Sequence, residues 1–433
     1  MSKNINRKIK SNIKSNIKNN IKSNVNSNIS RNIGRNIKTD YIYCFFKNFD
    51  ISSSIWVLYL VYKGMSLWQI GIVEGIYHLT SFLFEVPTGA LADLLGRKKA
   101  IIVGRICSAL SSILCLFGHN MWHFAIAFAI SAIGQNLNSG SEEALVYDSM
   151  KQIGQENRYM KVNSRLNVII EIAQGTATVL GGVISEYSFT WSYIIAVMIA
   201  LIALVPAALF VEPDIKGDLN DDNRENSLVG FSTKNKINVI AVLKEHFRIS
   251  IMIIRNDSKL RKILLYYPMV FTFHTIVFFY GQEFFSTLGL NKIEISMIML
   301  LASGVSLLGA ITSERFLLLF DNKAKYLAST LMGIGIIVMS RHNLIVSILA
   351  FAIINYANAV LYPIQSQAVN ELIPSKQRAT IISVNSMIFS ILMFVLFPFC
   401  GFIADKSDLH FVFLGLGILQ LLIMLSINRK NRK

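Results

Sequence analysis

The chain has 433 residues, of which 53% are hydrophobic and 16% charged, with a formal net charge of +16. Soluble domains carry about 25% charged residues, so this composition excludes an ordinary soluble domain and indicates a membrane protein. Apolar runs of about 17–25 residues should then recur, and Lys and Arg should gather in alternate loops.

The N-terminal segment 1–40 is a basic, low-complexity tail without a recognisable cleavable signal peptide. It holds ten Lys or Arg and no acid before Thr39, and an aliphatic residue stands at every fourth position from Ile5 to Ile37. On a helix this period drifts by ~40° per repeat, and the Asn and Ser content disfavours a stable helix. We expect a disordered tail; contact with anionic lipid is the alternative.

Twelve apolar stretches follow, and long uniform runs of this kind indicate membrane-spanning helices. They cover 41–62, 69–92, 100–118, 122–147, 162–185, 190–211, 263–284, 294–313, 326–341, 344–370, 380–404 and 409–427. The predicted fold is an all-α integral membrane protein with 12 transmembrane helices. The predicted domains are two six-helix bundles over 41–211 and 263–427, a linker over 212–262 and a basic tail over 428–433.

The distribution of positive charge orients the predicted spans. With the N-terminus inside, 36 of the 42 Lys and Arg fall on the cytoplasmic side. The predicted outer loops hold only Lys63, Lys292, Arg341 and Lys406. This skew follows the positive-inside rule for an even number of spans with both termini cytoplasmic. The end of the linker, INVIAVLKEHFRISIMII, is either an amphipathic helix on the inner membrane surface or a plain tether.

Residues 89–99, GALADLLGRKK, interrupt the apolar sequence between the second and third predicted spans. The two glycines should allow a tight reversal. Arg97, Lys98 and Lys99 should anchor the loop at anionic headgroups. Asp93 can face the positive N-terminus of a neighbouring helix, an interaction of about 0.3–2 kcal/mol. The alternative is a topology signal without a gating role.

This stretch resembles the loop 2–3 signature of the major facilitator superfamily. The matching residues are Gly89, Asp93, Gly96, Arg97 and Lys98. The usual basic residue after the acid is absent, because Leu94 stands there. A second stretch, NELIPSKQRATIISVNS at 370–386, resembles the start of the eleventh helix in drug-efflux-type members and contains Arg378.

The resemblance implies alternating access to a site near mid-membrane between two six-helix bundles. In the family, the acid at the position of Asp93 faces the start of the eleventh helix on the cytoplasmic side and favours the outward-open state. Gly175, Gly181 and Gly182 in the fifth span are reminiscent of a glycine-rich antiporter signature. Close helix packing by small residues explains these glycines equally well.

Ionisable residues inside spans are costly and usually functional. Asp50, about nine residues into the first span, can couple proton movement to substrate binding, or it can simply pair with Lys47. Glu171, central in the fifth span, is an equal candidate for a cavity-facing acid.

The second span adds further candidates. Glu74 and His78 are four residues apart and should meet on one helix face. Glu85 lies nearer the cytoplasmic end. Arg105 in the third span is a natural partner for Glu85 or for an acid of the fourth span, and a Glu85–Arg105 pair would have a structural rather than a coupling role.

Polar residues of the second half can complete a cavity. They are His274 in the seventh span and Asn355, Asn358 and Gln365 in the tenth. A lone His on an apolar face is more often a packing residue. The seventh span also carries FTFHTIVFFY, so acids from one bundle can face aromatic rings from the other, an arrangement that suits lipophilic cations.

Three functional classes are compatible with these features. The first is a proton-coupled exporter of small amphipathic or cationic compounds, the second a proton-coupled nutrient importer, and the third a membrane enzyme or sensor. The third is disfavoured, because no Walker loop, H-E-x-x-H or G-x-S-x-G motif is present. We expect a monomer in the bacterial inner membrane whose partners are a small-molecule substrate, protons and lipid.

No cofactor, metal or nucleic acid is expected. The four cysteines lie in apolar runs without metal-ligand spacing and should be small buried hydrophobic residues. The basic tail lacks the interleaved aromatic residues that stack on bases.

Overall fold

The computed structural model describes residues 33–213, 248, 258–372 and 378–431. The predicted tail up to residue 32 and most of the linker lie outside the described residues. The first half contains a helix over 33–48, followed by α2 (Trp56–Tyr62), α3 (Leu67–Leu95), α4 (Arg97–Phe117), α5 (Met121–Asn138), α6 (Ser141–Gln152), the 3-10 turn η1 (Glu156–Arg158), α7 (Tyr159–Tyr187), α8 (Phe189–Ile202) and α9 (Leu204–Leu209).

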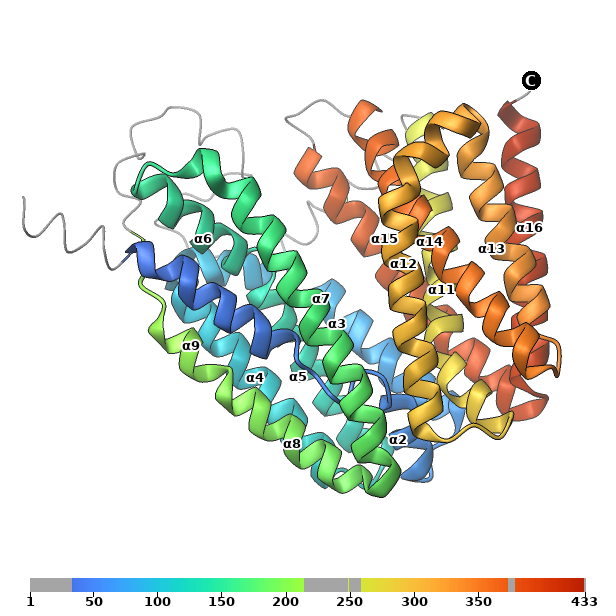
Figure 1. The fold of residues 1–433 in the computed structure, drawn as a ribbon, viewed down its shortest axis with the longest axis horizontal. Helices are drawn as coiled ribbons and strands as arrows, with labels where there is room; N and C mark the ends of the chain where they lie inside the picture. The colour runs from blue at the N-terminus through green and yellow to red at the C-terminus, as the bar shows by residue number, and fades with distance from the viewer. Residues whose placement is uncertain (1–32, 214–247, 249–257, 373–377, 432–433) are drawn as a thin grey trace, which may run out of the picture.

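The second half is also helical, and no strand occurs among the described residues. It contains α11 (Ser258–Thr287), α12 (Lys292–Phe320), the 3-10 turn η4 (Asp321–Lys323), α13 (Ala324–Met339), α14 (Leu344–Leu372), α15 (Arg378–Lys406) and α16 (Leu409–Asn431). Each half forms a bundle, and the two bundles lie side by side (Figure 1).

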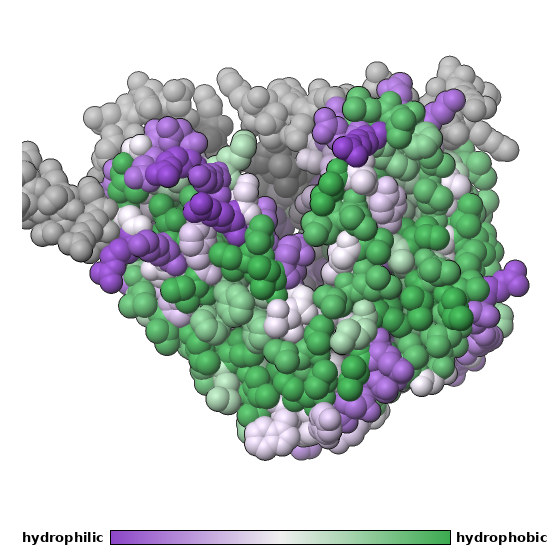
Figure 2. Space-filling view, in the orientation of Figure 1, coloured by the Kyte–Doolittle hydropathy of each residue, from purple (hydrophilic) through white to green (hydrophobic). Residues whose placement is uncertain are grey.

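Eight helices in the described part of the chain are long and apolar enough to cross a membrane. Figure 2 shows hydrophobic residues along the sides of both bundles and hydrophilic residues gathered toward their ends. Such a surface suits a bilayer, whose acyl chains offer no hydrogen bonds. The predicted class, an all-α membrane protein, is confirmed.

The first predicted span, 41–62, is not one continuous helix, so this prediction is wrong. The helix ends at residue 48 and α2 begins at Trp56; we call the seven residues between them, 49–55, the break. Asp and Ser side chains compete with helical hydrogen bonds by binding nearby backbone groups. Here Ser53 Oγ donates to Asp50 O at 2.8 Å.

The break fits against α7 because Gly181 has no side chain. The Ile51 carbonyl oxygen lies so close to Gly181 that an added Cβ would overlap it. Ser54 Oγ also donates to Thr178 O on α7, at 3.2 Å. The glycine therefore has a packing role at this contact.

The fourth and sixth predicted spans are interrupted as well. The span 122–147 is divided at residues 139–140 into α5 and α6, and Gly140 has a φ of 75°, which side chains disfavour. The span 190–211 has one irregular residue, Ala203, between α8 and α9.

The disordered tail predicted over 1–40 extends too far, because residues 33–40 are helical. The buried Asn36 explains this difference. Its Nδ2 donates to Val211 O at 2.7 Å, and its Oδ1 accepts from Val211 N at 2.8 Å. These bonds tie the start of the first helix to the end of the first half.

One end of the molecule, which we call the closed end, carries the connections after α2, α7, α11 and α15, and the two halves are hydrogen-bonded to each other there. Tyr280 Oη donates to Leu67 O at 2.9 Å, and Lys292 N donates to Glu186 Oε2 at 2.9 Å. Figure 1 shows the bundles diverging toward the opposite, open end, where the C-terminus lies.

Close contact between α7 and α12 is expected to require Gly182. An added Cβ there would overlap the Ser296 side chain of α12. Gly182→Ala should therefore destabilise the protein by about 1–3 kcal/mol, the usual cost of overpacking. Thermal unfolding in detergent measures the effect. Gly175→Ala is the control, since Leu300 Cδ1 would lie an ordinary 3.4 Å from the new Cβ; an equal loss in both variants would contradict the argument.

Candidate functional site

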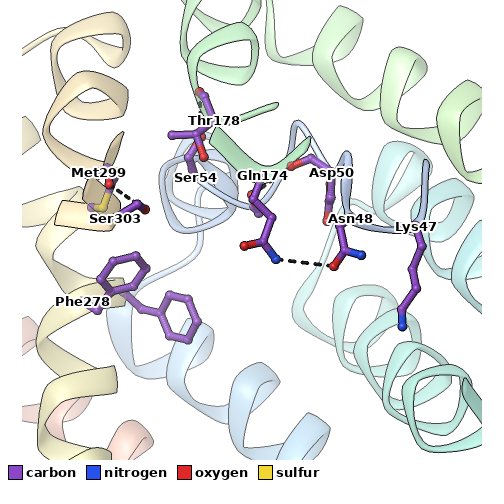
Figure 3. Close-up of a pocket in the computed structure, with 11 residues that line it drawn as sticks. Lys47, Asn48, Asp50, Ser54, Gln174, Thr178, Phe278, Met299 and Ser303 are labelled. Carbon is purple, nitrogen blue, oxygen red and sulfur yellow. Dashed lines mark hydrogen bonds between the residues drawn. The ribbon is translucent and has the colours of Figure 1, made fainter. Parts of the chain in front are cut away.

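A cavity of about 350 Å³ lies between the two halves, beside the break. The first half contributes mainly polar side chains, namely Lys47, Asn48, Asp50, Ser53 and Ser54 at or next to the break and Gln174 and Thr178 on α7. The second half contributes Phe278 and Phe279 on α11 and Met299 and Ser303 on α12. Figure 3 shows the two groups on opposite sides of the cavity.

Asp50 lies in the break, where the sequence predicted the middle of a helix. Its Oδ1 accepts hydrogen bonds from Ser52 N at 2.9 Å and Ser52 Oγ at 2.6 Å. Its side chain is exposed and lines the cavity. Ser52 thus fixes one oxygen of the carboxylate, while the other remains available to a ligand.

The break is also linked to α7 through amide side chains. Asn48 Nδ2 donates to Cys44 O at 2.8 Å, and Asn48 Oδ1 accepts from Gln174 Nε2 at 3.4 Å (Figure 3). The polar wall of the cavity therefore includes both the unwound chain and a long neighbouring helix.

The opposite wall is made of aromatic rings held by their neighbours. Phe278 stacks on Phe351 with ring centroids 5.9 Å apart, and its centroid lies 6.0 Å from that of His274. Phe279 meets Trp56 edge to face at 5.2 Å. These contacts orient the ring faces before any ligand arrives.

Glu171 does not line the cavity but lies on its approach from the open end. It shares one face of α7 with Gln174 and Thr178, at spacings of three and four residues. Its side chain is exposed. The cavity residues that the sequence did not indicate are Asn48, Ser53, Ser54, Gln174, Thr178, Met299 and Ser303. Gln174 and Thr178 could have been predicted, because they follow Glu171 at helical spacing and so share its face of α7.

Lys47 pairs with Glu142 of α6, so the alternative pairing with Asp50 is wrong. The Lys47 Nζ to Glu142 Oε2 distance is 2.5 Å, and both side chains are largely buried. Because the helix ends at residue 48, Asp50 no longer lies one turn beyond Lys47. The cation next to the cavity is thus already neutralised.

The predicted pairing of Glu85 with Arg105 is also wrong among the described residues. Arg105 lies over the Tyr43 ring, with the guanidinium carbon 6.0 Å from the centroid. Glu85 Oε1 accepts from Ser383 Oγ of α15 at 3.1 Å. The acid therefore bridges the two halves rather than two helices of one bundle.

The predicted contact between Glu74 and His78 is confirmed. His78 Nε2 lies 3.4 Å from Glu74 Oε1, and both residues are buried. The His78 ring meets Phe389 of α15 edge to face at 5.5 Å. Both residues of this pair belong to α3 and lie outside the cavity lining.

The polar residues predicted to face the cavity from the second half do not line it. His274 Nε2 lies 3.1 Å from Asn355 Oδ1, and Gln365 Nε2 donates to Asn385 Oδ1 at 2.9 Å. Asn358 Oδ1 is buried without a hydrogen-bond partner in the part of the chain that is described. Hydrogen bonds between helices thus occupy His274, Asn355 and Gln365, and the wall of the cavity that the second half supplies is mainly aromatic.

The charged stretch 89–99 contains a shorter turn than predicted. α3 extends through Leu95 and α4 begins at Arg97, so Gly96 alone makes the reversal, with a φ of 91°. Gly89 lies inside α3, and the prediction that it forms part of the turn is wrong.

The start of α4 is bound by acids of the first half. Glu212 accepts from Arg97 N and Lys98 N, one carboxylate oxygen to each, at 2.8 Å. Arg97 Nη1 lies 3.0 Å from Asp148 Oδ2 on α6. These protein contacts, which sequence spacing did not indicate, hold the loop in addition to any contact with headgroups.

The closed end contains an acid-to-helix contact of the kind predicted for Asp93. Asp405, in the last turn of α15, accepts from Leu67 N and Trp68 N at the start of α3, each at 2.9 Å. A carboxylate at a helix N-terminus is favourable. The side chains of Asp93 and Arg378 lie outside the described residues, so their contacts at the open end stay predictions.

A sequence profile described as Major Facilitator Superfamily matches residues 43–339. The uncharacterized MFS-type transporter YxaM of Bacillus subtilis is 25% identical over 349 residues, covering 78% of this chain and 80% of its own. The inner membrane transport protein YajR of Escherichia coli is 28% identical over 191 residues, covering 43% of this chain and 39% of its own.

Solved transporter structures share the fold. The nucleoside transporter NupG superposes with a TM-score of 0.70 at 13% identity, covering 93% of this chain and 99% of its own. A D-xylose-proton symporter superposes with a TM-score of 0.62 at 14% identity, covering 92% of this chain and 97% of its own.

Asp405→Asn is expected to weaken the closed end, because the amide lacks the charge that favours the α3 N-terminus. The loss of about 0.3–2 kcal/mol should raise the population open at this end by about 2- to 30-fold. Spin labels at the exposed Tyr187 and Ser407, one on each half, report that population as a longer distance. Asp408→Asn is the control, since Asp408 bonds within its own segment; an equal shift in both variants would refute the role.

Proposed function

Because the chain belongs to the Major Facilitator Superfamily, we propose that it exports small amphipathic or cationic compounds by proton-coupled alternating access. The observation that carries this proposal is the cavity in which Asp50 stands opposite Phe278 and Phe279. Membership of the superfamily makes the chain a membrane transporter; the substrate class, direction and coupling are the proposal.

The proposed topology has twelve spans in two six-helix bundles, with both termini in the cytoplasm of a bacterial cell and the protein acting as a monomer. Joining the helices across the break, residues 139–140 and Ala203 gives six spans in the first half. The helices α11–α16 provide six more. The charge skew supports this orientation, since 36 of 42 cations lie on the proposed inner side.

With this topology the open end faces the cytoplasm, and the structure corresponds to an inward-open state. Transport then requires the contact of Asp405 with α3 to break while contacts form at the open end. Glu85 already bonds to Ser383 across the halves, and Asp93 is proposed to join it. Contacts of this strength can bias an equilibrium without locking it.

The cavity chemistry supports a cationic or amphipathic substrate. Asp50 supplies negative charge, while the neighbouring Lys47 is neutralised by Glu142. A cation over the ring of Phe278 would gain about 0.5–2 kcal/mol. A sugar site would be expected to contain more paired Asn or Gln side chains and Trp. The second half here supplies mainly Phe278, Phe279 and Met299.

Antiport follows when a proton and the substrate compete for one carboxylate. A proton on Asp50 would remove the charge that holds a cation and so release it. Glu171 lies on the approach to the cavity and is the other candidate carrier. Either acid would link substrate release to proton entry.

Energised inverted vesicles test the coupling directly. Lipophilic cations and neutral amphiphiles are added while lumenal pH is followed, and wild type should release protons with a compound that it exports. Asp50→Asn or Glu171→Gln, whichever removes the coupling acid, should abolish this release, whereas the exposed Glu156→Gln should behave as wild type. If folded wild type releases no protons and whole cells accumulate a nutrient with the proton gradient, the protein is an importer.

Phe278→Leu tests the aromatic wall separately from the acid. Loss of the cation–π contact should weaken binding of a lipophilic cation by about 2- to 30-fold while leaving a neutral amphiphile nearly unaffected. Phe278→Tyr keeps the ring face and should bind as wild type. Equilibrium binding in detergent measures both, and equal losses for the charged and the neutral compound would argue against the cation–π contact.

A further inference from the structure

A buried cluster of potential metal ligands lies between the helix over 33–48 and α6. Asp40, Cys44 and Glu142 are only 0%, 2% and 7% exposed. Their ligand atoms all lie within 4.8 Å of one another. We propose that these three residues bind one thiophilic divalent cation of the zinc class.

The distances within the cluster suit such an ion. Cys44 Sγ lies 2.8 Å from Glu142 Oε1 and 3.9 Å from Asp40 Oδ1. Tetrahedral zinc, with bonds of about 2.3 Å to sulfur and 2.0–2.2 Å to oxygen, sets these atoms roughly 3.6 Å apart. The two sulfur-to-oxygen separations bracket this value, and the third separation, between the carboxylates, is within 4.8 Å, so small side-chain shifts would close the site.

The charge of the cluster also favours a cation. Lys47 is bound to Glu142, so with Cys44 as a thiol the two carboxylates leave one negative charge unbalanced in a buried place. A divalent ion held by the thiolate and both carboxylates would make the whole group neutral, Lys47 included. Unbalanced buried charge is costly, and neutrality removes that cost.

One oxygen of the cluster has no partner. Asp40 Oδ2 is buried and makes no hydrogen bond within the described residues. Asp40 itself is fully buried, and buried polar atoms are nearly always bonded. A bound cation would satisfy the carboxylate; a proton on Asp40 is the competing explanation.

The cavity offers a path to the cluster. Lys47 both lines the cavity and contacts Glu142, so an ion entering from the cavity would pass its side chain. On binding, the Cys44 thiol would lose its proton to cavity water, because the thiolate is the ligand. The ion would then fasten the first helix to α6, directly before the break.

Titration of the purified full-length protein with Cd²⁺ tests the site, because a cadmium–thiolate bond gives an ultraviolet charge-transfer band. Wild type in detergent should show the band with one equivalent bound, and Zn²⁺ should compete for it. Cys44→Ser should abolish the band, and Asp40→Asn should weaken binding at least about tenfold. Cys107→Ser, which changes a thiol on α4 outside the cluster, should leave both unchanged.

The proposal is overturned if monodisperse wild type binds no Cd²⁺, in which case a proton neutralises Asp40. It is equally overturned if the band persists in Cys44→Ser, disappears in Cys107→Ser, or if Ca²⁺ binds as tightly as Cd²⁺. Should Cys44→Ser fail to fold, the thermal unfolding of wild type decides, because a bound ion must raise its Tm. Metal binding is measured without transport, so failure here leaves the proposed function untouched.

Discussion

Backbone groups that leave a helix inside an apolar bundle must find new partners, and this requirement positions the cavity. At the break, the Asp50 carboxylate accepts a hydrogen bond from Ser52 N, and Ser53 Oγ donates one to Asp50 O. Val57 N, at the start of α2, donates to Gln282 Oε1 of the second half at 3.2 Å. Gly181 admits the chain against α7. The carboxylate, the polar wall and the contact with the aromatic half thus arise from one unwound segment.

Several charged side chains of the first half are matched in pairs, whereas Asp50 has no ion-pair partner among the described residues. The pairs are Lys47 with Glu142, Glu74 with His78, and Arg97 with Asp148. Each pair joins helices or turns of a helix. Asp50 is held through neutral groups of Ser52, and in the described part of the chain it is the one acid in the lining of this cavity. The acid that lines the cavity is therefore a different one from the acids of these pairs.

Sequence patterns predicted those features that depend on local spacing. Hydropathy located the helices, the four-residue spacing paired Glu74 with His78, and composition separated a charged half from an aromatic one. The break was missed because a hydropathy window averages seven irregular residues into a long apolar run. The partners of Lys47 and Glu85 were missed because they lie 95 and 298 positions away along the chain. Only the packing of helices brings such residues together.

The single-residue joint at Gly96 has a mechanical consequence. Because a single residue connects α3 and α4, a tilt of α3 must also move α4. The ion pair of Arg97 with Asp148 connects the start of α4 to α6. The hydrogen bonds of Glu212 connect it to the chain that follows α9. We therefore expect these helices of the first bundle to move together as one rigid body. The linker begins at Glu212, so any displacement of that residue would act directly on the start of α4.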